Sequence, residues 1–486
     1  MRYRITAREG QYRREVSPKS GLADKIIEYG ILGLIIFSPL PAASVHEWSI
    51  LVIQLAVVVM MIAYFMMKER PETNELLSYS MRRPGYLFIG LFIFIFIQVI
   101  PLPKFLVSAF SPNAYSFREA FSAEFAKVEF ICFSLMPSRT LKSGLELLTY
   151  FLLGFLIVKT VTRRRQIRRI FSLLVIMGVF EALYGFFELY RTNPRILFYK
   201  KVYGLDSVTG TFVNRNHLSG YLEMIIPLAI GLIIARADIF SLAGMRWREK
   251  IFRLTEKGFS INLILTLCFI IMSLAIIFSK SRSGIFILVF IFILLIELVL
   301  VYFGRDKPQQ RFSRNFLAVT FLIIALISLY IGIEATIERF SVDKLLQEGR
   351  PLYWSNVSTI IGDFPLFGIG LGSFASFYPA YERDVELDYG RLSHAHNDYL
   401  EYFSELGLVG GILLVGGILF MTVNSFLMWR ERRHPEIRGL ALGGIIAVVC
   451  ILIHSITDFN LHIPANMLLF SVILSLTIAT VFYQKS

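Results

Sequence analysis

Long apolar runs separated by short polar segments fill the chain from Ile26 to Tyr483. A membrane-spanning helix needs about 20 predominantly apolar residues, because each residue advances the helix by only about 1.5 Å. We therefore predict about twelve transmembrane helices, near residues 26–43, 48–67, 86–103, 144–161, 170–190, 217–235, 260–279, 284–303, 316–334, 401–428, 440–456 and 464–482. Pro39, Pro101 and Pro227 are expected to kink or end their helices.

The composition agrees with this pattern. Hydrophobic residues make up 55% of the 486 residues and charged residues only 17%, whereas a soluble domain has about 25% charged residues. No repeat and no Pro-rich or Gly/Ser-rich linker divides the chain. We expect an all-α integral membrane protein with one polytopic domain over residues 1–486, and no cleavable signal peptide, because the first apolar stretch has the length of a membrane span.

The positive charges are distributed unevenly between the two sides of the predicted bundle. Of the 49 Lys and Arg residues, 32 lie on the side that holds the N-terminus and 17 on the other. Cytoplasmic loops carry the excess of Lys and Arg, so both termini are predicted to be cytoplasmic. The basic run 163–169 is expected to bind anionic lipid head groups, which explains the net charge of +13 without a nucleic-acid partner.

Two outer segments are long enough to form structure of their own. Residues 104–143 mix phenylalanines, among them Phe105, Phe110, Phe117, Phe121 and Phe125, with charged residues. This fits amphipathic helices on the outer membrane surface and, nearly as well, a loop packed on the bundle. Residues 335–400 form the largest hydrophilic segment, and its aromatic residues supply apolar area for packing. Loops of this length are usually functional or disordered, and we expect a large, ordered periplasmic loop.

Within this loop, Arg350 opens a helix-like stretch that runs to Ile361, and the glycine-rich run Gly368–Gly372 follows it. The run lacks the spacing of a dinucleotide-binding fingerprint and does not follow a strand in a βαβ unit. We expect instead a turn that brings the backbone close to a helix or a ligand.

Three side chains near the end of the loop could carry chemistry: His394, His396 and Asp398. A joint metal site would need an extended backbone, because residues two apart on a helix point to different faces. A general base fits the same residues, since imidazole can accept a hydroxyl proton near neutral pH. Simple hydrogen bonding at the membrane interface is a third reading.

Three further polar turns face the same side. Residues 210–217 (Gly-Thr-Phe-Val-Asn-Arg-Asn-His) precede the sixth span, and the turn 279–284 places Arg282 at the membrane boundary, where a charge must pair or snorkel. Arg282 could reach a lipid phosphate, or it could hold a substrate diphosphate bidentately. The turn 454–466 is rich in polar groups without Lys or Arg, and helix capping and packing would account for it.

Together these four motifs resemble the O-antigen ligase and polymerase superfamily of bacterial envelope enzymes. In that family a His-Asn pair is followed after nine residues by Gly-x-x-Gly, as His396-Asn397 is followed here by Gly407 and Gly410. The resemblance extends from about residue 200 to the C-terminus, and earlier residues match only as hydrophobic spans. It implies a glycosyltransferase-C-like membrane fold.

The resemblance also implies an activity at the periplasmic face of the bacterial inner membrane. A glycan would pass with inversion from undecaprenyl diphosphate to a hydroxyl of lipid A core or another acceptor, without metal or cofactor. His396 would take the hydroxyl proton, and Arg215 and Arg282, with Arg350 as a third cation, would steady the departing diphosphate. The remaining residues expected at the substrate are His394, Asn214 and Asn397.

Two alternatives stay open. A polymerase would use the same chemistry to join lipid-linked repeat units; ligases often have leucine four residues after the membrane-edge arginine, where this chain has Phe286. A transporter or lipid flippase is the other alternative, but such proteins place ionisable or broken sites near mid-membrane. Here the spans are continuously apolar, and the acidic residues inside them form no mirrored pattern: Glu181, Glu188, Glu223 and Glu297.

Overall fold

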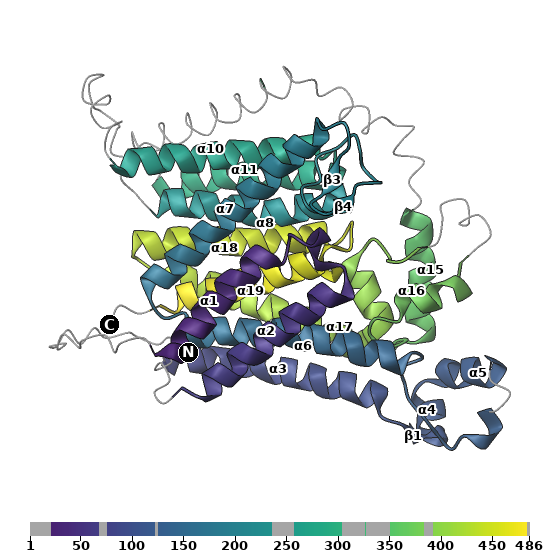
Figure 1. Ribbon diagram of the computed structural model, residues 1–486. Helices are drawn as coiled ribbons and strands as arrows, with labels where there is room; N and C mark the ends of the chain where they lie inside the picture. The colour runs from purple at the N-terminus through teal and green to yellow at the C-terminus, as the bar shows by residue number, and fades with distance from the viewer. Residues whose placement is uncertain are drawn as a thin grey trace.

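The computed structural model describes residues 21–67, 75–121, 125–235, 257–303, 326, 350–382 and 392–483. Long helices dominate it and confirm the all-α prediction (Figure 1). They are α1 (Leu22–Phe37), α2 (Glu47–Phe65), α3 (Glu75–Val99), α6 (Pro137–Thr160), α7 (Arg164–Leu189), α8 (Arg215–Ile234), α10 (Lys257–Phe278), α11 (Arg282–Phe303), α17 (Asp398–Glu431), α18 (Pro435–His454) and α19 (Pro464–Val481).

Each of these helices overlaps a predicted span, and nine of them, within the described residues, are long and apolar enough to cross a membrane. The protein is therefore a multi-pass membrane protein. Apart from residue 326, the predicted span 316–334 lies outside the described residues. The predicted end of the first span at residue 43 was wrong: α1 ends at Phe37, because Pro39 and Pro41 cannot donate the backbone hydrogen bonds of a continuing helix.

The centre of the bundle is formed by α8, α18 and α19, whose side chains are almost all buried. Glycines allow α8 and α18 to meet backbone to backbone. A Cβ atom at Gly443 would lie 2.5 Å from the carbonyl oxygen of Pro227, and one at Gly231 would lie 2.7 Å from that of Gly439. Small residues at such contacts are the usual basis of close helix packing in membranes.

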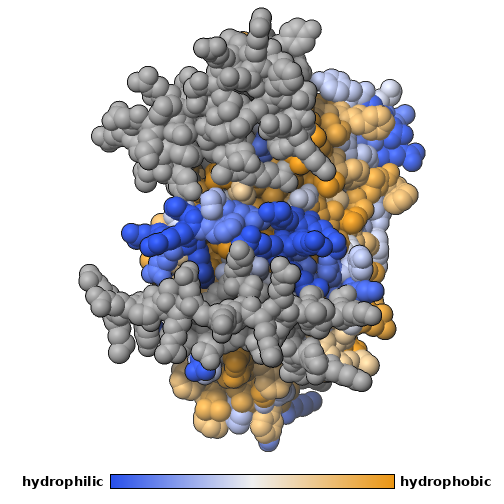
Figure 2. Space-filling view, turned by 90° about the vertical axis from the view of Figure 1, so that its left-hand side faces the viewer, coloured by the Kyte–Doolittle hydropathy of each residue, from blue (hydrophilic) through white to orange (hydrophobic). Residues whose placement is uncertain are grey.

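One end of the bundle, which we call the basic end, gathers the starts of α1, α7 and α18 and the end of α19. Arg169 pairs with Glu28 of α1 at 2.5 Å, while Arg164 lies 3.5 Å from Glu436 of α18 and over the ring of Tyr483. Figure 2 looks onto this end and shows hydrophilic surface across its middle, with apolar surface on either side. The described chain thus begins and ends at the same end of the bundle.

The opposite end, the loop end, carries the large loop. Its described parts are α15 (Arg350–Asp363), α16 (Phe374–Phe377), η5 (Tyr378–Ala380) and residues 392–397, and they share an apolar core. The expected helix from Arg350 to Ile361 is confirmed by α15. The described parts of the loop are therefore ordered, as predicted.

The segment 104–143 packs against these described parts of the large loop. It contains α4 (Lys104–Phe110), α5 (Pro112–Phe121), η2 (Phe125–Lys127) and β2 (Phe130–Ile131), which pairs in antiparallel register with β1 (Leu102–Pro103), just before the segment. Asn113 donates a hydrogen bond to the carbonyl of Asp363 at 2.9 Å, and the ring of Phe117 lies 4.9 Å from that of Phe377. Of the two alternatives, packing onto the protein is the one observed for α5, while Phe105 on α4 remains exposed.

The glycine-rich run 368–372 binds the large loop to α17 through backbone hydrogen bonds. At Gly407 the helix is broken, with φ 64° and ψ −175°, and the backbone of the run fits into the break. The N–H of Gly370 donates to the carbonyl of Glu405 at 2.9 Å, and a Cβ atom at Gly368 would lie 2.4 Å from that same oxygen. The predicted turn that brings backbone close to a helix is confirmed.

A second hairpin lies in the connector from α7 to α8. It pairs β3 (Arg195–Ile196) with β4 (Tyr199–Lys200) in antiparallel register. Both strands lie at the loop end (Figure 1).

Candidate functional site

The polar groups at the loop end converge on Asp458, which lies in the turn between α18 and α19 and is fully buried. Its Oδ1 atom lies 3.1 Å from Nδ1 of His396 and accepts the backbone N–H of Phe459 at 2.9 Å. Its Oδ2 atom accepts a hydrogen bond from the side-chain amide of Asn216, at the start of α8, at 2.6 Å. Three segments far apart in sequence therefore meet at one carboxylate.

His396 has an unusual backbone conformation for a residue with a side chain, with φ +49°. Such a conformation is strained and persists only where the surroundings impose it. Here the next helix is tied down: the N–H of Asp398 donates to the carbonyls of Ser455 and Asp458, at 2.9 and 3.2 Å. Because Nδ1 faces Asp458 and the side chain is 31% exposed, Nε2 is the ring nitrogen left for a substrate.

The environment of Asp458 keeps its carboxyl group ionised. Burial favours the neutral form, but the hydrogen bond with His396 and the nearby charge of Arg350 outweigh it and hold the pKa of Asp458 well below its usual range. A permanent negative charge therefore lies behind His396. It can orient the imidazole and stabilise an imidazolium, as the aspartate of a catalytic triad does.

The three predicted arginines are each the first residue of a helix. Arg215 begins α8 and directly precedes Asn216. Arg282 begins α11, and the next residue, Ser283, shares a 2.9 Å hydrogen bond with Thr457, the neighbour of Asp458. Arg350 begins α15, and its charge reaches the same carboxylate. The arginines thus come from three separate helices to the surroundings of the His396–Asp458 pair.

A second group of polar residues lies beside the first. Nδ1 of His394 lies 2.8 Å from Oε1 of Glu401, and the other oxygen of Glu401 accepts the N–H of Ala395 at 2.8 Å. Nδ1 of His462 lies 2.6 Å from Oδ1 of Asp398, and its Nε2 lies 3.5 Å from Glu401. Glu401 therefore fixes both the side chain and the backbone of the residues that lead into His396.

His462 lies between the two carboxylates of this group. Burial disfavours its charged form, but the charges of Glu401 and Asp398 and the hydrogen bond to Asp398 outweigh burial and raise the pKa of His462 to about 9. At neutral pH it is therefore a cation that neutralises part of the buried negative charge.

The three residues considered as metal ligands do not converge. His394 faces Glu401, His396 faces Asp458, and Asp398 faces His462. Within the described part of the chain, no group of three or more His, Cys, Asp or Glu side chains has the arrangement of a metal site.

The two predicted asparagines are helix caps. The side chain of Asn214 accepts the N–H of Asn216 at 2.9 Å at the start of α8, and that of Asn397 accepts the N–H of Leu400 at 3.1 Å at the start of α17. Side-chain caps of this kind satisfy backbone donors that the helix leaves unpaired. Asn214 therefore holds the start of the helix that carries Arg215, and Asn397 holds the start of α17 directly after His396.

Four residues of the site were not predicted from the sequence: Asn216, Glu401, Asp458 and His462. The turn 454–466 was expected to cap and pack, but its Asp458 carboxylate holds His396 and its His462 bridges two carboxylates. One signal in the sequence could have revealed Asp458. It is an acidic residue in a polar turn that has no Lys or Arg, so it needs another partner, and the histidines predicted on the same side of the membrane were the candidates.

The acidic residues inside the spans have internal partners. Glu181 accepts the N–H and the hydroxyl of Thr211, at 2.8 and 2.9 Å, and Glu223 lies 2.9 Å from Nδ1 of His454. Glu188 pairs with Arg191 at 3.0 Å. The side chain of Glu297 lies outside the described residues.

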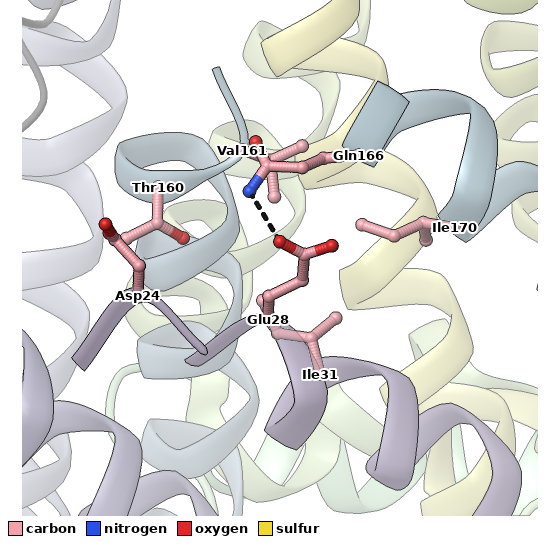
Figure 3. A pocket seen from close by; sticks show the side chains of 7 residues that line it. All are labelled: Asp24, Glu28, Ile31, Thr160, Val161, Gln166 and Ile170. Atoms are coloured by element: carbon pink, nitrogen blue, oxygen red, sulfur yellow. Dashed lines mark hydrogen bonds between the residues drawn. The ribbon is translucent and has the colours of Figure 1, made fainter. Parts of the chain in front are cut away.

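A small pocket lies at the basic end, away from these groups (Figure 3). Glu28 and Gln166 face each other in it at 3.1 Å. The other residues that line it are Asp24, Ile31, Thr160, Val161 and Ile170. It holds no predicted site residue, so the site at the loop end is the better candidate.

Comparison with known proteins agrees with the motifs. Residues 267–415 match the family model described as O-Antigen ligase. The chain is also 21% identical, over 336 residues, to the exopolysaccharide production protein ExoQ of Rhizobium meliloti (strain 1021), covering 66% of this chain and 67% of that protein. The resemblance to the O-antigen ligase and polymerase superfamily is thus confirmed, and the matched region contains Arg282, Arg350 and His396.

Proposed function

We propose that this multi-pass membrane protein, a glycan-processing enzyme of the ligase or polymerase type by its resemblance, transfers a glycan from undecaprenyl diphosphate to an acceptor hydroxyl. The observation that carries the proposal is the His396–Asp458 pair, at 3.1 Å, beside helix starts that carry Arg215, Arg282 and Arg350. A base beside several fixed cations suits the attack of a hydroxyl on a sugar that leaves a diphosphate.

In the proposed reaction, the acceptor hydroxyl approaches Nε2 of His396. As its oxygen forms a bond to the anomeric carbon, its proton passes to His396. The bond from that carbon to the diphosphate oxygen breaks on the opposite side, and its electron pair leaves with the diphosphate. This displacement inverts the anomeric configuration, and the imidazolium is stabilised by the Asp458 carboxylate.

The arginines would act on the leaving group. Negative charge grows on the bridging oxygen of the diphosphate in the transition state, where fixed positive groups are most effective. Guanidinium groups bind phosphate oxygens bidentately and stay charged at all physiological pH values. Arg215, Arg282 and Arg350 would thus supply the charge neutralisation for which other transferases use a divalent metal ion, and the scheme requires neither metal nor nucleotide.

The finer assignment that we favour is a ligase that joins a completed glycan to lipid A core or another acceptor. It would act at the periplasmic face of the bacterial inner membrane with both chain termini cytoplasmic. The charge distribution supports this orientation, because the basic end gathers the arginines of the run 163–169.

A polymerase is the second candidate, and a specific observation favours it. The relative identified by sequence is described as an exopolysaccharide production protein, and Phe286 takes the place where ligases often have leucine. A polymerase would use the same base and cations, with a second lipid-linked glycan as the acceptor. A transporter is disfavoured because the polar network gathers at one end of the bundle.

The test is reconstitution of the purified protein in liposomes with an undecaprenyl diphosphate glycan and candidate acceptors. Transfer to lipid A core would establish a ligase, and longer carrier-linked chains would establish a polymerase. The His396→Ala variant, inserted in equal amount, should form neither product. Movement of the glycolipid across the bilayer without a new glycosidic bond would overturn the proposal.

A further inference from the structure

The hairpin of β3 and β4 folds back alongside α7. The hydroxyl of Tyr184 donates to the carbonyl of Arg195 at 3.0 Å and accepts the N–H of Leu197 at 2.8 Å, and the N–H of Arg195 donates to Glu188. Tyr184 lies five residues before the end of α7, or about 7.5 Å at 1.5 Å per residue. The hairpin is therefore attached at the level of the last turns of a membrane-spanning helix.

The turn of this hairpin and the residues just after β4 are apolar and exposed. Phe198, between the two strands, is 92% exposed, and Val202 and Tyr203 just after them are 61% and 71% exposed. The backbone around the turn is held in place. Hydrogen bonds to α7 fix Arg195 and Leu197 before Phe198, and β4 after it is held by its pairing with β3 and by the bond from the N–H of Lys201 to the carbonyl of Pro194 at 3.1 Å. A rigid apolar surface of this kind indicates a partner that covers it.

The surface next to the tip identifies that partner. The exposed apolar side chains of α7 recur every three or four residues and so form one outward face of the helix: Ile176, Phe180, Leu183, Phe187 and Tyr190. On a spanning helix this face meets lipid, and it runs up to the hairpin. On the other side, the ring of Tyr199 lies 4.9 Å from that of His46, two residues before the half-exposed Trp48.

The charges at the same place suit a membrane surface. Arg195 and Lys200, one on each strand, are exposed. Aromatic side chains collect at the level of lipid head groups, and Lys and Arg beside them bind anionic lipid phosphates. Aliphatic Val202, just after β4, favours lipid over a sugar surface.

From this arrangement we infer that residues 195–203 form an interfacial anchor in the lipid leaflet at the loop end. Phe198, Val202 and Tyr203 enter the boundary between head groups and acyl chains. Arg195 and Lys200 contact lipid phosphates.

The anchor is coupled to the proposed site, and this part of the inference rests on the proposed function. Lys201, just after β4, donates to the carbonyl of Ser207 at 2.9 Å, and Asp206 pairs with Lys280 at 2.8 Å. Lys280 lies two residues before Arg282. The depth of the hairpin in the leaflet therefore sets the depth of Arg282, at the level where the diphosphate of a lipid-linked donor lies.

The first test needs no activity. Phe198→Trp and the control Thr359→Trp, on an exposed position of α15, are placed in vesicles whose phosphatidylcholine is brominated near the top of the acyl chains. The quenching of the native tryptophans is subtracted. We expect strong quenching at position 198 and little at position 359. Equal, weak quenching at both positions would overturn the anchor.

A sugar surface is the competing outcome. If soluble oligosaccharide shielded the position-198 tryptophan from acrylamide in detergent, while bromolipid failed to quench it, the hairpin would bind glycan instead and the inference would be wrong.

The coupling is tested with Phe198→Ser in liposomes. We expect the KM for the lipid-linked donor to rise several-fold with kcat unchanged, and no effect in detergent on a donor with a short, water-soluble lipid. An unchanged KM in liposomes would overturn the coupling alone. Absence of transfer by the wild-type protein would count against the proposed function, while the quenching result would stand.

Discussion

Nδ1 of His396 lies 3.1 Å from Oδ1 of Asp458, although 62 residues and two membrane-spanning helices separate them in the chain. Asp458 is fully buried and His396 is partly exposed, so the pair has a protected charged side and a side open to a substrate. Because the buried carboxylate stabilises the protonated imidazole while the exposed side of the ring meets the substrate, His396 can act as a base in each turnover.

Replacing Asp458 with asparagine should lower kcat by about a hundredfold or more, within the range that a general base contributes. The amide retains the size of the side chain but removes the negative charge that stabilises the imidazolium. Turnover of the reconstituted protein measures the effect, and thermal unfolding in detergent checks that the variant is folded. Wild-type turnover in a folded Asp458→Asn variant would remove this residue from the mechanism.

Replacing Arg282 with alanine should raise the KM for the lipid diphosphate donor about tenfold, which corresponds to the loss of one charge-assisted contact. Arg139 on α6 is an exposed arginine that serves as the matched control. Arg139→Ala should leave the KM unchanged. Equal effects of the two substitutions would show that Arg282 acts only through general surface charge.

Replacing Gly407 with alanine should destabilise the protein by about 1–3 kcal/mol, the cost of a strained backbone conformation. Gly407 has φ +64°, and a Cβ atom there would lie 2.4 Å from the carbonyl oxygen of Leu366. The control is Gly416, farther along α17, where a Cβ atom would meet nothing within 4 Å. Gly416→Ala should be neutral or stabilising by up to about 1 kcal/mol, as thermal unfolding would show.

Stability should fall as pH rises from about 6.5, the ordinary value for histidine, through about 9, the pKa of His462 in the folded protein. A raised pKa means that the folded state holds this proton more tightly, so its contribution is complete below the unfolded value and is lost above the folded one. Thermal unfolding across this range measures the slope. His462→Gln should flatten it, and an unchanged slope would show that another group is responsible.

The sequence by itself determined the membrane-spanning architecture and the chemical class. Transmembrane helices are visible in sequence because lipid requires each span to be apolar over its whole length, which is a local property. The His396-Asn397 pair and the glycine that follows it at Gly407 were also visible in the sequence, because they form a short local motif. In the structure this glycine has a positive φ and breaks α17.

Only the tertiary structure decided which side chains face one another. His394, His396 and Asp398 are neighbours in sequence, yet each faces a different partner. The partners are Glu401, Asp458 and His462, and the last two lie beyond residue 450.

The same reason applies to Asn214 and Asn397, which the sequence placed among the substrate-binding candidates. Only the structure shows that their side-chain oxygens also cap α8 and α17, because capping depends on where the nearest backbone donors lie. Asp458 was overlooked for the converse reason: alone it is an ordinary turn residue, and only the packing of α8, α17 and α18 brings His396 and Asn216 to its carboxylate.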